Sequence, residues 1–181
     1  HRGPSINLSG WFKIDGESLI PSEGNEINQL RQQEFSDNAR ALNVFIIDDF
    51  TEGDGTLGIA GGVPGPNGVE ATSASGLVVA SEPHLSEEEE GVFELQYSLL
   101  ASTIAHELGH QLGLEHTTED DGSTQSSIDD LESCAYAELG SSEAEECPDG
   151  RNLMFWTSGD EPQDQLSAEQ VFVLNHNPII Y

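Results

Sequence analysis

Basic residues are scarce in this sequence: five lysines and arginines stand against 34 aspartates and glutamates, a formal net charge of −29. A field of this sign repels nucleic-acid phosphates and anionic membranes, so we expect no nucleic-acid partner. No run of about 18 apolar residues is present, which excludes a membrane span. The start of the sequence lacks a basic segment followed by an apolar stretch, so we expect no signal peptide in this chain. The length suits a single domain over 1–181, which we expect to be monomeric.

Cysteine is also scarce, with Cys134 and Cys147 as the only two. Both lie in a polar, acidic stretch, and an even count in a small acidic protein favours one disulfide and a secreted, extracellular protein. Such a bridge closes a loop of about 14 residues, which stabilises a fold by roughly 3 kcal/mol in the chain-entropy model. Two free thiols are the alternative. The cysteines do not form a C-x-x-C pair, so we do not interpret them as zinc ligands.

Apolar spacing predicts both strands and helices. Ser86 with Glu89 fits a capping box for a long helix whose periodicity improves from Val92. Ser167 with Gln170 fits a second capping box. The other predicted elements are strands at 6–14, 41–50 and 75–80, a short amphipathic helix at 25–35, one short helix at 127–139 in an otherwise irregular segment 117–150, and a terminal helix at 168–177.

A glycine-rich segment follows the strand at 41–50. Gly53, Gly55 and Gly58 match G-x-G-x-x-G, a pattern that binds dinucleotides when a helix opens directly after it. Here Pro64 and Pro66 follow instead, and they do not open a long helix. We therefore interpret this segment as a loop and expect no nucleotide cofactor.

The stretch HELGHQLGLEH, residues 106–116, contains the pattern H-E-x-x-H-x-x-G-x-x-H. His106 and His110 are four residues apart, so a helix places both imidazoles on one face, where they can hold one zinc ion. Glu107 lies beside the first ligand and can take a proton from a water. Gly113 can adopt the left-handed conformation that ends a helix, so that His116 returns as a third ligand. Three protein ligands leave one position open, which is typical of a catalytic zinc site.

At these residues the sequence resembles the metzincin clan of zinc endopeptidases. The clan also has a Met-turn, a methionine beneath the metal, and the only methionine here is Met154, 38 residues after His116. The resemblance implies an α+β fold of two lobes, about 1–113 and 114–181. The first holds a twisted mixed sheet under the active-site helix, and the second is irregular with a C-terminal helix. It also implies that the strand at 75–80 is the edge along which an extended peptide binds.

Within the clan the sequence is most similar to bacterial pappalysin-type members, through Thr117, Thr118 and the cysteine-bearing acidic loop. Trp156 stands where astacin-like members have a tyrosine, so no tyrosine is expected to stabilise the intermediate. Pappalysin-like relatives carry calcium near this region, which suggests a calcium site as the alternative to solvated loop carboxylates. The residues for such a site are Asp120, Asp121, Asp129 and Asp130.

The sequence thus predicts a secreted zinc endopeptidase with one catalytic zinc, Glu107 as the base and a peptide or protein substrate. The alternative is a non-catalytic, metal-stabilised binding module that retains the fold. An intact Glu107 argues against that alternative, because a binding module needs no base there. A further hypothesis is that Asp160, Glu161 and Asp164 favour a cationic side chain next to the cut.

Overall fold

The computed structural model of the chain contains a small mixed sheet, an outlying hairpin and three α-helices among the residues that it describes. The elements are α1 Glu26–Arg31, β1 Val44–Ile47, β2 Gly58–Ile59, β3 Leu77–Ala80, the 3-10 helix η1 Glu82–His84, β4 Leu85–Glu89, β5 Val92–Leu95, α2 Tyr97–Leu112 and α3 Ala168–His176. The described residues are 26–32, 42–50, 55–66, 69, 71–119, 122–124, 126–131, 134, 147–159, 162–178 and 180. The strand predicted at 6–14 and most of the helix predicted at 127–139 lie outside them.

The three-stranded sheet has the order β1-β3-β2, with β3 parallel to β1 and antiparallel to β2. The prediction that the strand at 75–80 is the edge is therefore wrong, because β3 lies in the middle. All four of its residues, LVVA, are fully buried, as expected for an apolar run without alternation. The loop interpretation of the glycine-rich segment is also wrong at two residues, since Gly58 and Ile59 form the edge strand β2.

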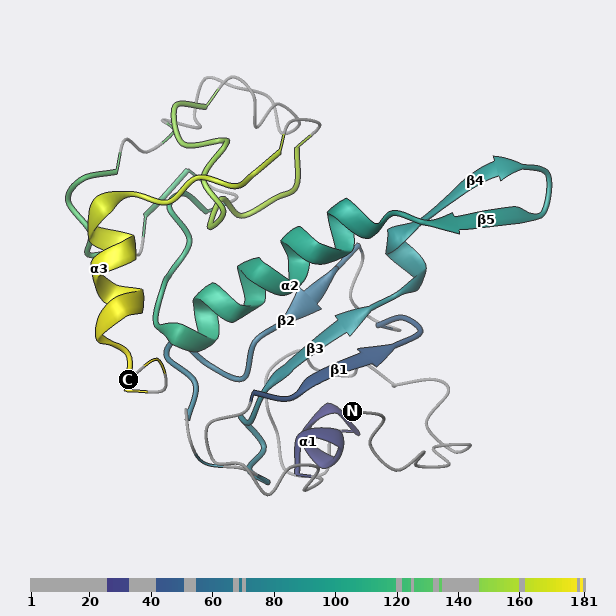
Figure 1. Cartoon of the computed structure of the whole chain (residues 1–181), viewed down its shortest axis with the longest axis horizontal. Coiled ribbons are helices and arrows are strands. Elements are labelled where there is room, and N and C mark those ends of the chain that lie inside the picture. The colour runs from purple at the N-terminus through teal and green to yellow at the C-terminus, as the bar shows by residue number, and fades with distance from the viewer. Residues whose placement is uncertain are drawn as a thin grey trace.

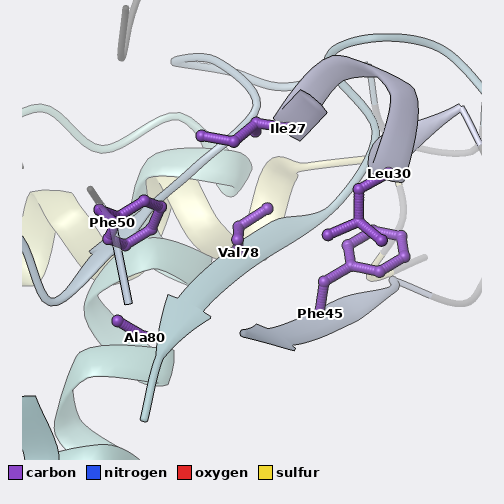
Figure 2. Close-up of a cluster of buried hydrophobic side chains, with 6 residues drawn as sticks. All are labelled: Ile27, Leu30, Phe45, Phe50, Val78 and Ala80. Carbon is purple, nitrogen blue, oxygen red and sulfur yellow. The ribbon is translucent and has the colours of Figure 1, made fainter. Parts of the chain in front are cut away.

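Helix α1 covers one face of this sheet and builds the main apolar core (Figure 2). Ile27 and Leu30 of α1 are 2% and 3% exposed. They belong to one cluster with side chains from β1 and β3 and from the segment after β1: Phe45, Phe50, Val78 and Ala80. Helix α2 lies on the other side of the sheet, in contact with β2 and β3, so the sheet separates the two helices (Figure 1).

The residues from 85 to 95 form a β-hairpin, so the helix predicted to start at the Ser86 capping box is wrong there. The hairpin turns at Gly91, which has a φ of +76° and donates its N–H to the Glu87 carboxylate at 2.9 Å. Val92 and Phe93 have the β-branched and aromatic side chains that strands favour. The hairpin projects away from the start of α2, which begins only at Tyr97 (Figure 1).

The C-terminal end of α2 and the start of α3 agree with the sequence. Helix α2 ends at Gly113, whose φ of +109° is left-handed, and the Leu114 N–H donates to the Gly109 carbonyl at 2.9 Å. Helix α3 starts at the predicted capping box, in which Ser167 and Gln170 exchange both hydrogen bonds. No helix in the described part of the chain has the length and apolar character needed to cross a membrane.

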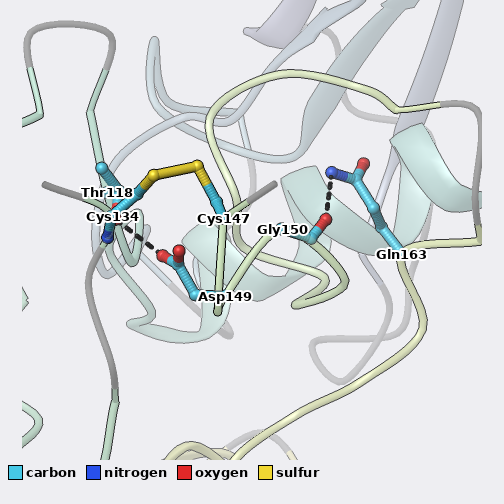
Figure 3. The surroundings of a disulfide bond; sticks show 6 residues. All are labelled: Thr118, Cys134, Cys147, Asp149, Gly150 and Gln163. Atoms are coloured by element: carbon cyan, nitrogen blue, oxygen red, sulfur yellow. Dashed lines mark hydrogen bonds between the residues drawn. A yellow bond between two sulfur atoms is a disulfide. The ribbon is translucent and has the colours of Figure 1, made fainter. Parts of the chain in front are cut away.

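The predicted disulfide is confirmed: Cys134 and Cys147 are bonded, with their Cα atoms 5.1 Å apart (Figure 3). Both cysteines are buried beside Phe155. Thr118 joins this region to the chain that follows His116, because its hydroxyl donates to Asp149 at 2.6 Å and accepts from the Cys134 N–H at 3.0 Å. The bridge therefore fastens two segments next to the histidine cluster.

Replacing both cysteines by serine is expected to lower the free energy of unfolding by about 3 kcal/mol, because the open chain regains the entropy of a loop of about 14 residues. Urea unfolding of the oxidised wild type and of the double variant measures this difference. Adding a reductant should lower the stability of the wild type to that of the variant and leave the variant unchanged. Equal stability of the two oxidised proteins would contradict the bridge's structural role.

Candidate active site

Three histidines converge at the C-terminal part of α2. His106 and His110 lie on one face of the helix, and the chain that turns at Gly113 brings His116 back toward them. The Nε2 atom of His116 is 3.2 Å from that of His106 and 3.1 Å from that of His110. Ligands at the corners of a zinc tetrahedron are about 3.3 Å apart, given zinc–nitrogen bonds of about 2.05 Å. The cluster therefore has the size of a three-histidine metal site.

The other ring nitrogen of each histidine faces an acceptor. His106 Nδ1 donates to the Leu153 carbonyl at 2.6 Å, and His110 Nδ1 donates to the Leu114 carbonyl at 2.8 Å. His116 Nδ1 donates to the Glu119 carboxylate at 2.9 Å. Because these acceptors have no proton to give, each Nδ1 carries the hydrogen and each Nε2 presents a lone pair. Three lone pairs facing one another fit a shared cation, and ligating histidines commonly have such outer partners.

His106 and His110 resist protonation, as metal ligands must. Burial, followed by the neighbouring His110 and His116, lowers the pKa of His106 to about 3. Burial, followed by His116, lowers the pKa of His110 to about 4. Both rings are therefore neutral at physiological pH, with their Nε2 lone pairs available.

Glu107 lies beside the first histidine, against the edge strand β2. Its side chain is 7% exposed, and a Cβ atom on Gly58 would stand 2.8 Å from its Cγ. Burial raises the pKa of Glu107 to about 7, although an N–H bond from Ala60 and the charge of Arg31 oppose that rise. A carboxyl group with a pKa near neutrality is suited to accept and return a proton. Gly58 is required at its position because a larger residue would displace this carboxylate.

Met154 is fully buried and packs against α2 at Gly109, next to His110 in the sequence. A Cβ atom on Gly109 would stand 2.4 Å from its sulfur, so α2 and the methionine pack at a distance that only glycine allows. The Met154 carbonyl accepts from the Thr117 N–H at 3.0 Å, which joins the methionine turn to the chain after His116. Asn152 accepts from the Met154 N–H at 2.9 Å and exchanges amide hydrogen bonds with Gln170 of α3.

A pocket of about 460 Å³ adjoins His106 and His116. Its wall comes from the segment ending in β2, from α2 and from the residues around and after the methionine turn. The lining residues are Gly55, Thr56, Leu57, Gly58, Ser102, Thr103, His106, His116, Leu153, Phe155, Trp156, Thr157, Ser158 and Gln163. Among these described lining residues none is an aspartate, glutamate, lysine or arginine. Asp164 does not line it, and Asp160 and Glu161 lie outside the described residues.

The carboxylates predicted to bind calcium are only partly described. Asp120 and Asp121 lie outside the described residues. Asp130 accepts the Glu169 N–H at 3.0 Å, and Asp129 donates its N–H to the Glu169 carboxylate at 3.2 Å. Asp130 thus helps to cap α3. In the part of the chain that is described, the one group of three potential metal ligands is the histidine cluster, and a calcium site stays a prediction.

Three residues of this site were not identified from the sequence. Glu119 binds His116, and its signal is a carboxylate three residues after the third histidine. Gly109 makes room for Met154, and a glycine inside a helical stretch gives no local signal of that contact. Arg31 is far away in sequence but donates to the Ile59 carbonyl at 2.9 Å, and no local pattern indicates that contact.

Comparison with known proteins agrees with this geometry. The family model described as metallo-peptidase family M12 matches residues 18–165, about four fifths of the chain. No curated protein and no solved structure gives a significant match. The matched range includes α1, the sheet, the three histidines and Met154. We conclude that the chain belongs to metallopeptidase family M12.

Proposed function

We propose that this protein is a secreted zinc-dependent endopeptidase in which Glu107 is the general base. The observation that carries the proposal is the convergence of three Nε2 atoms, each on a ring whose Nδ1 is engaged by an acceptor. That arrangement leaves the histidines no proton to share among themselves and fits a divalent cation that prefers imidazole ligands. The disulfide supports secretion, because such bonds persist in oxidising compartments.

The residues would divide the reaction as follows. His106, His110 and His116 would hold zinc, which when bound supplies a Lewis acid for the scissile carbonyl and for water. Glu107 would take the proton of the attacking water and deliver it to the leaving amine. Its pKa of about 7 allows both steps near neutral pH. Met154 would form the floor under the histidines, held by its contact with Gly109.

The substrate would lie extended along β2. The Leu57 carbonyl accepts from the Ala80 N–H at 2.9 Å, so residue 57 faces β3. Backbone groups alternate along an antiparallel strand, so those of Gly58 point away from β3 and toward the pocket side. A peptide could pair there by β-augmentation and place one side chain in the uncharged pocket beside His116. The described lining residues carry no charge, so we expect a neutral substrate side chain there. A cationic preference set by Asp160, Glu161 and Asp164 stays a prediction.

Several finer features belong to the same proposal. The pappalysin-like character rests on Thr117 and Thr118, which are both buried, and on the cysteine-bearing acidic loop, where the Cys134 N–H donates to Thr118. The division into two lobes would fall at Gly113, where α2 ends and the chain turns back. We expect the enzyme to act as a monomer, because each ligand and the base come from one chain.

The experiment for this proposal is digestion of a broad peptide library by the zinc-loaded protein, with cleaved products identified by mass spectrometry. We expect cleavage within peptides, with neutral residues enriched beside the cut. Chelation of the metal should stop cleavage, and added zinc should restore it. A correctly folded, zinc-loaded protein that cleaves no peptide would instead favour a non-catalytic binding module.

A further inference from the structure

Arg31 is a buried cation next to the active site in a chain that is otherwise strongly acidic. Its side chain is 1% exposed, although arginine rarely lies in an interior without a specific partner. It stands at the last position of α1, which Ile27 and Leu30 fasten to the sheet (Figure 2). Burial lowers the pKa of Arg31 to about 10, and the guanidinium stays charged at physiological pH. The contacts of the Arg31 guanidinium therefore indicate its role.

The contact is with the edge strand. A terminal nitrogen of Arg31 donates to the Ile59 carbonyl at 2.9 Å, across 28 residues of sequence. The carbonyl of Ile59 and the N–H of Ala60 belong to the same peptide group. That N–H donates to the carboxylate of Glu107. One peptide group therefore stands between a buried cation and the proposed general base.

This arrangement has a physical consequence. A cation on the carbonyl side of a peptide draws electron density toward the oxygen and makes the N–H on the other side a stronger donor. The peptide is planar and rigid, so its two hydrogen bonds also fix where the strand stands relative to Glu107. The close approach of Gly58 to the same carboxylate removes further freedom, with its hypothetical Cβ 3.2 Å from Glu107 Oε1.

We propose that Arg31 is a positioning residue that acts on Glu107 through the Ile59–Ala60 peptide group. It holds the edge strand at the distance the carboxylate requires and strengthens the N–H bond that orients that carboxylate. The inference rests on the proposed function for its catalytic part, because Glu107 is the base only if the protein is a peptidase. The link between Arg31 and the Ala60 N–H is independent of catalysis.

The test compares Arg31→Lys, which keeps a cation, with Arg31→Gln, which keeps a donor and loses the charge. Arg31→Gln should lower kcat about tenfold to a hundredfold, with a much smaller change in KM, because a slightly misplaced catalytic group slows the chemical step. Arg31→Lys should recover most of the loss. Arg151→Gln is the matched control, since Arg151 is an exposed arginine that does not line the pocket, and it should keep the parent kinetics.

A spectroscopic measurement accompanies the kinetics. The amide proton of Ala60, followed by NMR in zinc-free protein, should move upfield in Arg31→Gln and stay near its parent position in Arg31→Lys. It should also move upfield in Glu107→Gln, which keeps the fold and weakens the acceptor. The proposal is overturned if Arg31→Gln retains the parent kcat and Ala60 shift, or if Arg31→Lys is no better than Arg31→Gln.

The two measurements separate this inference from the proposed function. If the wild-type protein cleaves no peptide, the proposed function fails, while the Ala60 shifts still decide whether Arg31 and Glu107 are coupled. If Arg31→Gln does not fold, Arg31→Lys and Glu107→Gln decide. A parent-like Ala60 shift in Arg31→Lys with an upfield shift in Glu107→Gln supports the link, and an unchanged shift in Glu107→Gln overturns it.

Discussion

Replacing Glu107 by glutamine is expected to reduce peptide cleavage by about a thousandfold, within the range of about 10²–10⁴ that general acid–base catalysis contributes. Glutamine has almost the same shape, so it fits the space beside Gly58, and its carbonyl oxygen can still accept the Ala60 N–H. It lacks the ability to take a proton from water. Zinc content and stability should remain those of the parent, since the three histidines are untouched.

The kinetics should show the loss in kcat, measured on a peptide identified from the library. Glu115→Gln is the matched control, because it removes the other glutamate of the same motif and should leave cleavage unchanged. If Glu107→Gln cleaved peptides at the parent rate, Glu107 would not be the base. If it lost zinc as well, its role would be structural support of the histidines.

Replacing His116 by alanine is expected to weaken zinc binding by more than about a hundredfold, because even the outer partners of metal ligands contribute about 10–100-fold. Replacing Glu119 by glutamine tests that outer contribution directly, since its carboxylate is 2.9 Å from His116 Nδ1. We expect about a tenfold loss of affinity there, as a neutral amide is a weaker acceptor for the ring N–H.

Competition with a chromogenic chelator measures both affinities. His176→Ala is the control: this exposed histidine of α3 stacks on Phe172, away from the cluster, and its removal should leave zinc affinity unchanged. An equal affinity in His116→Ala and the parent would show that the third histidine is not a ligand. A Glu119→Gln variant with the parent affinity would remove Glu119 from the site.

The features predicted correctly from the sequence are those that depend on neighbouring residues. His106 and His110 share a face because four residues make about one helical turn, and Gly113 ends the same helix by its own conformation. The α3 capping box was predicted for the same reason. The disulfide required no choice of partner once a bridge was assumed, since the chain has two cysteines.

The wrong predictions involve residues whose structure is decided at longer range. Ser86 and Glu89 have the spacing of a capping box, but the following Gly91, Val92 and Phe93 favour a hairpin. The capping box at Ser167 differs because Gln170 also bonds Asn152, so tertiary contacts reinforce the local pattern. Sequence spacing alone does not distinguish these two cases.

Strand order and the contacts of Arg31 required the fold. The apolar run LVVA is typical of a buried strand, but the resemblance implied an edge position, and the strand order places β3 in the middle. The edge next to α2 is instead the two-residue strand β2, which is too short to be identified from periodicity. Arg31 reaches Ile59 only because α1 packs across the sheet, and Glu107 meets the same peptide group from the opposite side.

We propose that three histidines bind one zinc ion and that this ion is required for Glu107 to cleave peptides. Titration of the metal-free protein with zinc, followed by the rate of peptide cleavage, tests it most directly. We expect no cleavage before zinc is added, a linear rise in rate with added zinc, and a plateau at one zinc per chain. Cleavage by the metal-free protein, or zinc binding at one equivalent without any cleavage, would contradict it.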